Sequence, residues 1–424
     1  MKHFFTTVIL FALLHQAVYS QEGRLPVKWD VAALEKVPES TPMPKLDHDG
    51  VKAALLQGVG WRGDETRFFV YYGIPEGADA VHPVPAMVLI HGGGGTARWE
   101  WVKQWVDRGY AAIAMGNNGQ LPVRIEGEPF DKRAENRALL PGGIPLECGD
   151  FEHALRPVED QWAYCAVANI MLSHSFLLSL PGVDADRIGV TGNSWGGFLT
   201  LLSAAVDKRY KFAAPVYGCG FYGEFDRHAG NEGEAWTRWL DLWDPSHYIP
   251  VIDVPISWAC GNTDFYFSFG ALQKSFALAE NVPYKAVRSP MVHTDGGYDG
   301  GVPEETYALA DHMFKGGADL PKVGDPKLGK RDKVSVTYDP AGRVPDKVEL
   351  LYTTSDEGPW EKRQWHVMDV GLPRKGNTVE VVIPADAWTF YFNVTTSDGL
   401  VASSSAMFRT SDGFVPASPC GNKR

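Results

Sequence analysis

The stretch VTGNSWGGFLTLL, residues 190–202, decides how this chain is interpreted. It contains a Gly-x-Ser-x-Gly pentapeptide centred on Ser194, with Gly192 and Gly196 on either side. A β-like run at residues 187–191 precedes the pentapeptide, and an apolar run of helical length follows it. A strand, a sharp turn and a helix in this order are the context of a nucleophile elbow, which lifts a serine Oγ clear of a sheet. The pentapeptide alone is also compatible with a plain glycine-rich strand end, so the rest of the chain must decide.

Short apolar runs of the kind that are buried in a parallel sheet recur along the chain. They lie at residues 86–90, 111–115, 212–217, 254–261 and 284–288. Helix-length segments at residues 99–107 and 158–180 separate some of them. This alternation predicts an α/β fold with a doubly wound, mostly parallel sheet. A helical patch is expected further upstream, at residues 51–56.

The run at residues 86–90 ends in His91 followed by four glycines. A glycine cluster after a buried strand can be a simple flexible turn, but it also matches the loop that offers a backbone N–H to a developing oxyanion. We expect the amides of Gly93 and of Trp195, the residue after the serine, to form such an oxyanion hole. His91 is expected to order the loop and not to act as a base, because its place before the glycines would point it into the scaffold.

An acid and a histidine follow the elbow, each after a later strand. Asp264 comes just after the run at residues 254–261, and His293 follows the run at 284–288. Serine, aspartate and histidine in this order are typical of α/β hydrolases. The histidine would take the serine proton while the aspartate fixes the histidine tautomer. The sequence therefore predicts a triad of Ser194, Asp264 and His293; Asp253 and His312 are weaker candidates for the acid and the base.

Aromatic residues cluster after the run at residues 212–217, where Tyr222, Trp236 and Trp239 are found. The near-helical spacing of the tryptophans is typical of a packed stripe. Their place beyond the carboxyl end of a strand is where ligands bind in α/β sheets. Both interpretations stay open, and the second makes these three residues candidate substrate contacts.

Several motifs resemble one branch of a known superfamily. They are HGGGG from residue 91, the stretch 180–221, WDPSHY from 243, GNTDFYF from 261 and MVH ending at 293. Over residues 61–315 the chain is similar to exported acetyl xylan esterases and dienelactone hydrolase-like enzymes of the α/β-hydrolase superfamily, which are related to prolyl oligopeptidase-type catalytic domains. The resemblance implies that Ser194 is the nucleophile, Asp264 the acid and His293 the base, with Gly93 and Trp195 as oxyanion donors.

One departure from this resemblance concerns the residue after the serine. The best-known acetyl xylan esterases carry a glutamine there and an aromatic residue within the oxyanion loop, whereas this chain has Trp195 and Gly93. The resemblance therefore implies the reaction class better than the substrate.

The expected domain organisation has five parts: a signal peptide at residues 1–20, an α/β-hydrolase catalytic domain at 21–320, a linker at 321–332, a β-sandwich at 333–412 and a tail at 413–424. Short, evenly spaced runs of β-branched and aromatic residues after residue 332 favour a small all-β, immunoglobulin-like sandwich. Its expected role is structural, and sugar binding through Trp360, Trp365 or Trp388 is the alternative. Asn393 begins a glycosylation sequon.

The composition and the apolar runs limit which binding partners and which cellular compartment are expected for this protein. A net charge of −12 without any basic block argues against a nucleic-acid partner. No run after the signal peptide approaches the ~20 apolar residues of a membrane span, so a secreted or periplasmic protein is expected. The five cysteines lack metal-ligand spacing and their pairing cannot be read from the sequence. No metal or cofactor is implied, and the oligomeric state is unknown.

These features predict an exported serine esterase. The resemblance, together with the exported and aromatic-rich character, implies that it acts on acetyl groups of polysaccharides or oligosaccharides, or on another small ester. A serine peptidase of the prolyl oligopeptidase type is the first alternative. A non-hydrolytic carbohydrate-binding or lyase-like protein on the same fold is the second, since fold does not fix function.

Overall fold

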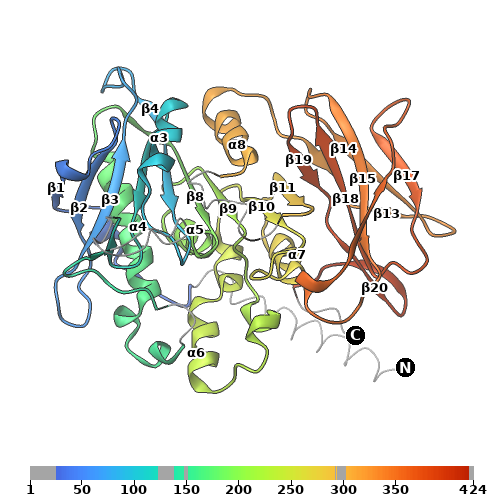
Figure 1. Ribbon diagram of the computed structural model, residues 1–424, viewed down its shortest axis with the longest axis horizontal. Coiled ribbons are helices and arrows are strands. Elements are labelled where there is room, and N and C mark those ends of the chain that lie inside the picture. Colours follow the sequence, from blue (N-terminus) through green and yellow to red (C-terminus); the bar gives the residue numbers. More distant parts are fainter. Residues whose placement is uncertain (1–24, 123–137, 148–150, 292, 294–301, 420–424) are drawn as a thin grey trace, which may run out of the picture.

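The computed structural model describes residues 25–122, 138–147, 151–291, 293 and 302–419 (Figure 1). A large sheet with helices on both faces forms one part, and a smaller all-β part lies beside it, in orange and red (Figure 1). The expected signal peptide lies outside the described residues, as do Cys148 and Cys420.

The large sheet has nine strands in the order β1-β2-β3-β5-β4-β8-β9-β10-β11. The strands are β1 (Ser40–Pro42), β2 (Lys52–Gln57), β3 (Arg67–Gly73), β4 (Val84–Ile90), β5 (Ala111–Met115), β8 (Val183–Asn193), β9 (Phe212–Val216), β10 (Ser257–Gly261) and β11 (Tyr284–Arg288). Neighbours from β5 to β11 run parallel, whereas β1, β2 and β3 are antiparallel additions. The predicted doubly wound, mostly parallel sheet is confirmed.

Helices cover both faces of this sheet because each parallel connection must cross over it. One face carries α3 (Trp99–Asp107) and α8 (Glu304–Lys315), and the other carries α4 (Trp162–Leu178), α5 (Trp195–Val206) and α7 (Phe269–Leu278). Alternate residues of the central strand β4 divide between the two cores: Met87 packs with the α3 side and Val88 with the α4 side. Two further helices, α2 (Val31–Leu34) and α6 (Glu234–Trp243), lie outside this frame, and α6 projects at the lower edge of Figure 1.

One local prediction was wrong. The helical patch expected at residues 51–56 is strand β2, whose residues pair with β3 and alternate between the two cores. A six-residue apolar run is too short for its periodicity to separate helix from strand, and pairing with β3 decides it. Near the C-terminus, the chain forms the two short strands β19 (Val401–Ser403) and β20 (Met407–Thr410).

The C-terminal part is a sandwich of two antiparallel sheets, as predicted. The first contains β12 (Lys322–Val323), β13 (Lys327–Leu328), β14 (Lys333–Asp339) and β17 (Thr378–Val382); the second contains β15 (Pro345–Thr353), β16 (Trp365–Asp369), β18 (Thr389–Thr396), β19, β20 and β21 (Gly413–Pro416). Inward side chains of both sheets share one apolar core. Strands β12 and β13 fall in the stretch expected to be a linker, and the domain boundaries themselves stay a prediction.

The sandwich covers the edge of the large sheet at β11. The Val287 N–H donates to Ser403 Oγ at 2.7 Å, and the Val287 carbonyl accepts from Asn393 Nδ2 at 2.9 Å. Such contacts satisfy backbone groups that an exposed edge strand would present to other chains. Asn393 is only 4% exposed, so its sequon is closed to glycosylation in the folded protein.

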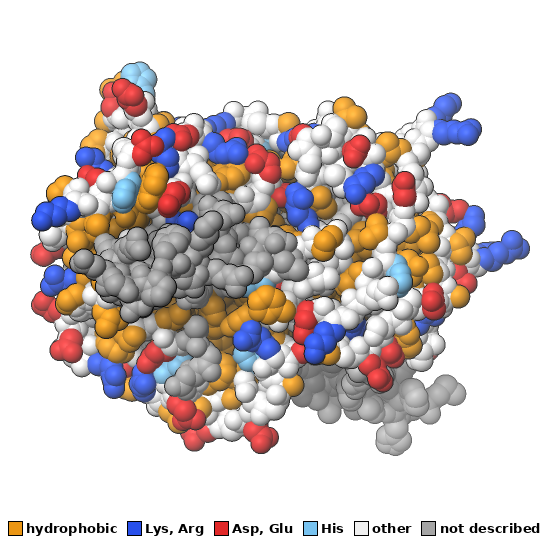
Figure 2. Space-filling view, in the orientation of Figure 1, with side chains coloured by type: hydrophobic (Ala, Val, Ile, Leu, Met, Phe, Trp, Pro, Cys, Tyr) orange, Lys and Arg blue, Asp and Glu red, His pale blue; other side chains and the backbone are white. Residues whose placement is uncertain are grey.

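The remaining segment between β5 and α4 contains a two-stranded pair, β6 (Gln120–Leu121) and β7 (Ala138–Leu139). On the face shown in Figure 2, acidic and basic side chains are interspersed and no block of one sign stands out. Among the described residues, no helix combines the length and apolar character needed to cross a membrane.

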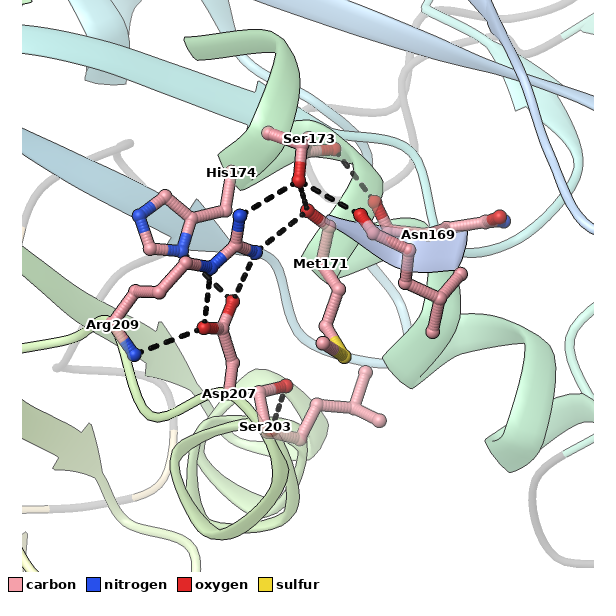
Figure 3. Close-up of polar contacts among 10 residues, drawn as sticks. Asn169, Met171, Ser173, His174, Ser203, Asp207 and Arg209 are labelled. Carbon is pink, nitrogen blue, oxygen red and sulfur yellow. Dashed lines mark hydrogen bonds and ion pairs between the residues drawn. The ribbon is translucent and has the colours of Figure 1, made fainter. Parts of the chain in front are cut away.

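A buried polar network ties α4 to the end of α5 (Figure 3). The Asp207 carboxylate accepts from Arg209 Nη2 at 2.7 Å and from His174 Nδ1 at 2.8 Å, and Arg209 Nη1 donates to Ser175 Oγ at 2.8 Å. Burial lowers the pKa of His174, which keeps the ring neutral. Burial alone would raise the pKa of Asp207, but the hydrogen bonds from Arg209 and His174 outweigh it and hold the pKa below its ordinary value.

Replacing Asp207 by asparagine is expected to lower the free energy of unfolding by about 3 kcal/mol, because a partly buried guanidinium loses its carboxylate. Urea denaturation at pH 7 measures this. Asp186→Asn is the control, since that carboxylate is 94% exposed and lies 3.7 Å from Lys211 Nζ. Because folding lowers the pKa of Asp207, the difference should shrink as the pH falls below about 4. Equal urea midpoints for both variants at pH 7 would show that the network contributes no stability.

Candidate active site

Ser194 occupies the sharp turn between β8 and α5. Its backbone dihedrals are φ 60° and ψ −118°, a strained conformation for a residue other than glycine. A Cβ at Gly196 would lie 2.0 Å from the Ile90 carbonyl oxygen, and one at Gly192 would lie 2.3 Å from that of Gly196. Only glycine fits at these two positions, so the turn has the geometry of a nucleophile elbow.

The structure brings Ser194, His293 and Asp264 into one hydrogen-bonded line. Ser194 Oγ lies 2.7 Å from His293 Nε2, and His293 Nδ1 lies 2.9 Å from Asp264 Oδ2. A carboxylate only accepts, so Nδ1 carries the proton and Nε2 is left to accept the serine hydrogen. His293 is 5% exposed and Asp264 is 2% exposed. This arrangement can draw a proton from the serine hydroxyl.

Backbone donors hold the carboxylate in place. The N–H groups of Tyr266 and Phe267 donate to Asp264 Oδ1 at 2.6 and 2.9 Å. They come from the same turn that follows β10, so the acid is oriented by its own loop. Carboxylates that accept backbone N–H bonds in this way have few alternative positions.

Aromatic rings surround the imidazole of His293. The centroids of Tyr217, Phe265, Tyr266 and Phe267 lie 4.7, 5.3, 5.4 and 5.7 Å from that of the His293 ring. Phe265 is 51% exposed, so it borders the solvent. The sequence interpretation gave these rings no role; the only signal was the run of three aromatic residues directly after Asp264.

The glycine-rich loop after β4 lies against Ser194. A Cβ on Gly92 would be 3.7 Å from Ser194 Oγ. Within the described part of the chain, the amide N–H groups of Gly93 and Trp195 donate to no other residue. They are therefore free to donate to a ligand bound beside Ser194, the arrangement that an oxyanion hole requires.

His91 uses both ring nitrogens on the scaffold. The Asn117 N–H donates to His91 Nε2 at 2.8 Å, so Nδ1 carries the proton that it shares with the Gly92 carbonyl at 2.7 Å. This neutral imidazole holds the start of the glycine-rich loop against the segment after β5, which agrees with the loop-ordering role expected for it.

The Trp195 indole packs against Gly93, so each residue limits which side chain fits at the other position. A Cβ on Gly93 would lie 2.6 Å from Trp195 Cδ1, because the indole fills the space beside the loop. The indole Nε1 donates to Tyr266 Oη at 2.9 Å, which fixes the ring. The two positions at which this chain departs from the sequence resemblance therefore pack against each other.

The three candidate substrate contacts, Tyr222, Trp236 and Trp239, belong to a buried aromatic cluster that includes Trp195. Tyr222 is 0% exposed, Trp239 2% and Trp236 8%. The Trp236 and Trp239 rings stack with centroids 5.8 Å apart, and those of Tyr222 and Trp239 lie 6.0 and 6.4 Å from that of Trp195. In this arrangement they support the indole and present little surface to a substrate. Direct contact with a substrate stays a prediction.

The rival titratable residues lie elsewhere. Asp253 is exposed and pairs with Lys208 at 3.4 Å, and His312 lies 3.5 Å from Asp319. Cys165, Cys219 and Cys260 are buried free thiols. Among the described residues, no group of three or more histidine, cysteine and acidic side chains is arranged to hold a metal ion.

Comparison with known proteins yields one family model and many similar structures. The model, described as acetyl xylan esterase (AXE1), matches residues 65–231. An acetyl xylan esterase from Paenibacillus sp. R4 is 21% identical, with 69% of this chain and 96% of that chain covered and a TM-score of 0.50. Acetyl xylan esterase 1 from Thermoanaerobacterium sp. is 18% identical, with 69% and 94% covered and a TM-score of 0.44.

A third similar structure is an acylaminoacyl peptidase from Pyrococcus horikoshii. It is 17% identical, with 63% of this chain and 48% of that chain covered and a TM-score of 0.41. The likeness to the Paenibacillus structure covers 69% of this chain and shows the shared fold. This likeness shows an α/β-hydrolase fold, and the match of residues 65–231 to an esterase model supports a carboxylic ester hydrolase of the serine type.

Proposed function

We propose that this protein is an exported serine esterase that removes acetyl groups from a polysaccharide or oligosaccharide, with Ser194 as nucleophile, His293 as base and Asp264 as acid. The observation that carries the proposal is the 2.7 Å contact between Ser194 Oγ and His293 Nε2, made from a strained elbow. The match of residues 65–231 to the acetyl xylan esterase model supports the substrate class.

The proposed reaction has two halves. Ser194 Oγ attacks the ester carbonyl carbon as its proton passes to His293 Nε2, and the amides of Gly93 and Trp195 hold the oxyanion. The tetrahedral intermediate collapses when the carbon–oxygen bond to the sugar breaks and the sugar oxygen takes the proton from His293. Water then attacks acetyl-Ser194, gives its proton to His293, and acetate leaves as the proton returns to Ser194 Oγ.

The aromatic side chains near Ser194 support a small acyl group in this proposal. The indole of Trp195 occupies the space beside the oxyanion loop, and four aromatic rings surround His293. Closely packed rings beside the triad favour a small acyl group over a long acyl chain. The acetyl group is the smallest acyl group in common polysaccharide esters.

Export is part of the proposal and rests on the sequence. Residues 1–20 combine a positive start, a short apolar segment and small residues near the expected cleavage point. An intact polysaccharide is too large to enter a cell, so export would bring the esterase to a polymeric substrate.

Release of acetate from acetylated xylan, compared with cleavage of aminoacyl p-nitroanilides, tests the proposed activity. We expect acetate release by the wild-type protein and none by Ser194→Ala, with aminoacyl amides left intact. Cleavage of the amides without acetate release would favour the peptidase alternative. Activity on neither substrate, in folded protein, would overturn the proposal in favour of the non-hydrolytic alternative.

A further inference from the structure

A cavity of about 960 Å³ lies where the hydrolase part meets the β-sandwich. The hydrolase part contributes Glu224 of η4 (Tyr222–Glu224), Asp226 of η5 (Asp226–His228) and the start of α7. The sandwich contributes residues from 356–363, 388–389 and 408–411. This volume falls in the range of about 300–1,000 Å³ that is typical of ligand pockets.

The wall of the cavity combines indole rings with hydrogen-bonding groups of both kinds. Trp360 and Trp388 line it, and hydroxyl groups come from Ser268, Thr389 and Thr410. Hydroxyl oxygens both donate and accept, whereas carboxylates only accept and guanidinium groups only donate. Such a surface suits a ligand that carries many hydroxyl groups and has apolar C–H faces that pack on indole rings.

Charge argues against an ionic ligand. Four carboxylates line the cavity, from Glu224, Asp226, Asp356 and Glu357, against three cations, from Lys274, Arg363 and Arg409. Lys274 Nζ pairs with Glu224 at 2.7 Å, and Arg363 stacks on Trp360 with its guanidinium carbon 3.7 Å from the ring centroid. The charges are nearly balanced and partly paired, so neither a phosphate nor a polycation gains much there.

Of the two indole rings in the cavity wall, Trp388 has fewer stacking partners than Trp360. Trp360 is wedged between Arg363 and Phe269, whose ring centroid lies 5.1 Å away. No aromatic ring or cation among the described residues stacks on Trp388, which is half-buried and anchored through its backbone N–H to the Thr353 carbonyl at 2.8 Å. A sugar ring could therefore pack on Trp388 without displacing another side chain.

Two separate segments connect the cavity to the active site. Asp226 lines the cavity, and the guanidinium of the next residue, Arg227, lies 3.6 Å from the centroid of the Tyr266 ring. Ser268, also in the wall, comes two residues after Tyr266. The Tyr266 ring centroid lies 5.4 Å from that of His293. The same aromatic ring thus contacts both a neighbour of the cavity wall and the triad histidine, so the cavity and the active site are close in space.

We propose that this cavity binds an uncharged stretch of the same polysaccharide chain whose acetyl ester lies at Ser194, with Trp388 as the main sugar contact. This inference rests on the proposed polysaccharide esterase function and adds a binding site at a distance from the ester. The sandwich then contributes to catalysis on polymers by holding the chain, and has no part in cleaving small esters.

The test uses two cavity variants of the full chain. Trp388→Ala removes the sugar platform, and Ser411→Trp adds bulk at the exposed rim while removing only the 3.4 Å contact of Ser411 Oγ with Asp412. Val382→Ala is the control, because Val382 lies on β17 of the other sheet and is 56% exposed. Both cavity variants should raise KM for acetylated xylan about 10-fold or more, while kcat/KM for p-nitrophenyl acetate stays within about 2-fold of wild type.

Binding is measured separately by titrating xylohexaose, cellohexaose and mannohexaose into the Ser194→Ala protein with and without Trp388→Ala. At least one oligosaccharide should bind, and Trp388→Ala should weaken that binding about 10-fold or more. Unchanged KM in both cavity variants, with acetate still released from the polymer, would overturn the inference and leave the proposed function standing. If the wild-type protein released no acetate from the polymer, the proposed function would fail. The titration alone would then test whether the cavity binds sugar. A lack of binding by all three oligosaccharides would overturn the inference.

Discussion

Replacing Ser194 by alanine is expected to lower kcat for p-nitrophenyl acetate by about 10⁵-fold or more, to near the uncatalysed rate. The hydroxyl is the only group of the triad that bonds to the acyl carbon, and triad residues act as a unit. His293 keeps its contact with Asp264 in this variant, so the imidazole stays oriented but has no nucleophile to activate. Steady-state kinetics with the purified protein measures the loss.

The fold should survive this substitution. Alanine has the same Cβ as serine, so the strained backbone at φ 60° is unchanged, and the Ser194 N–H still donates to the Val216 carbonyl at 3.0 Å. Thermal unfolding within a few degrees of wild type is expected, with exposed Ser397→Ala as the matched control. Wild-type turnover in a folded Ser194→Ala protein would contradict the proposed mechanism.

Asp264→Asn is expected to lower kcat about 10⁴-fold, because it favours the wrong tautomer of His293. The backbone N–H groups of Tyr266 and Phe267 hold Oδ1, so the asparagine amide nitrogen would take the place of Oδ2 and donate to His293 Nδ1. The ring would then carry its proton on Nε2 and donate to Ser194 Oγ, from which it could no longer accept a proton.

The comparison for this variant is Asp253→Asn. Asp253 is an exposed carboxylate paired with Lys208, and its replacement should leave kcat within about 2-fold of wild type. Thermal unfolding of both variants distinguishes a change in the His293 tautomer from unfolding of the protein. A folded Asp264→Asn protein that kept more than a tenth of wild-type kcat would show that Asp264 does not orient His293.

Sequence patterns predicted the three residues of the proposed triad because their proximity follows from chain order. Parallel strands end at one edge of the sheet, so residues that follow β8, β10 and β11 must lie near one another. This argument brings Ser194, Asp264 and His293 together without any knowledge of distances. The need for glycine on either side of Ser194 could also be predicted from the sequence, since a tight turn accepts no larger residue.

Other features depend on contacts that no local pattern encodes. The six residues of strand β2 are compatible with both the helical and the strand period, so their sequence does not separate the two. Antiparallel pairing with β3 makes this segment a strand. The dependence of Gly93 on the Trp195 indole joins residues about a hundred positions apart. The cavity at the sandwich combines residues 224–274 with 356–417, so neither half of the sequence reveals it alone.

The most direct test of the central claim is labelling with a fluorophosphonate, followed by intact-mass measurement and peptide mapping. This probe reacts with an activated serine and requires no assumption about the substrate. The proposed triad predicts one adduct on Ser194 in the wild-type protein and none in His293→Ala. An adduct on another serine, or no adduct in protein that is shown to be folded, would contradict it.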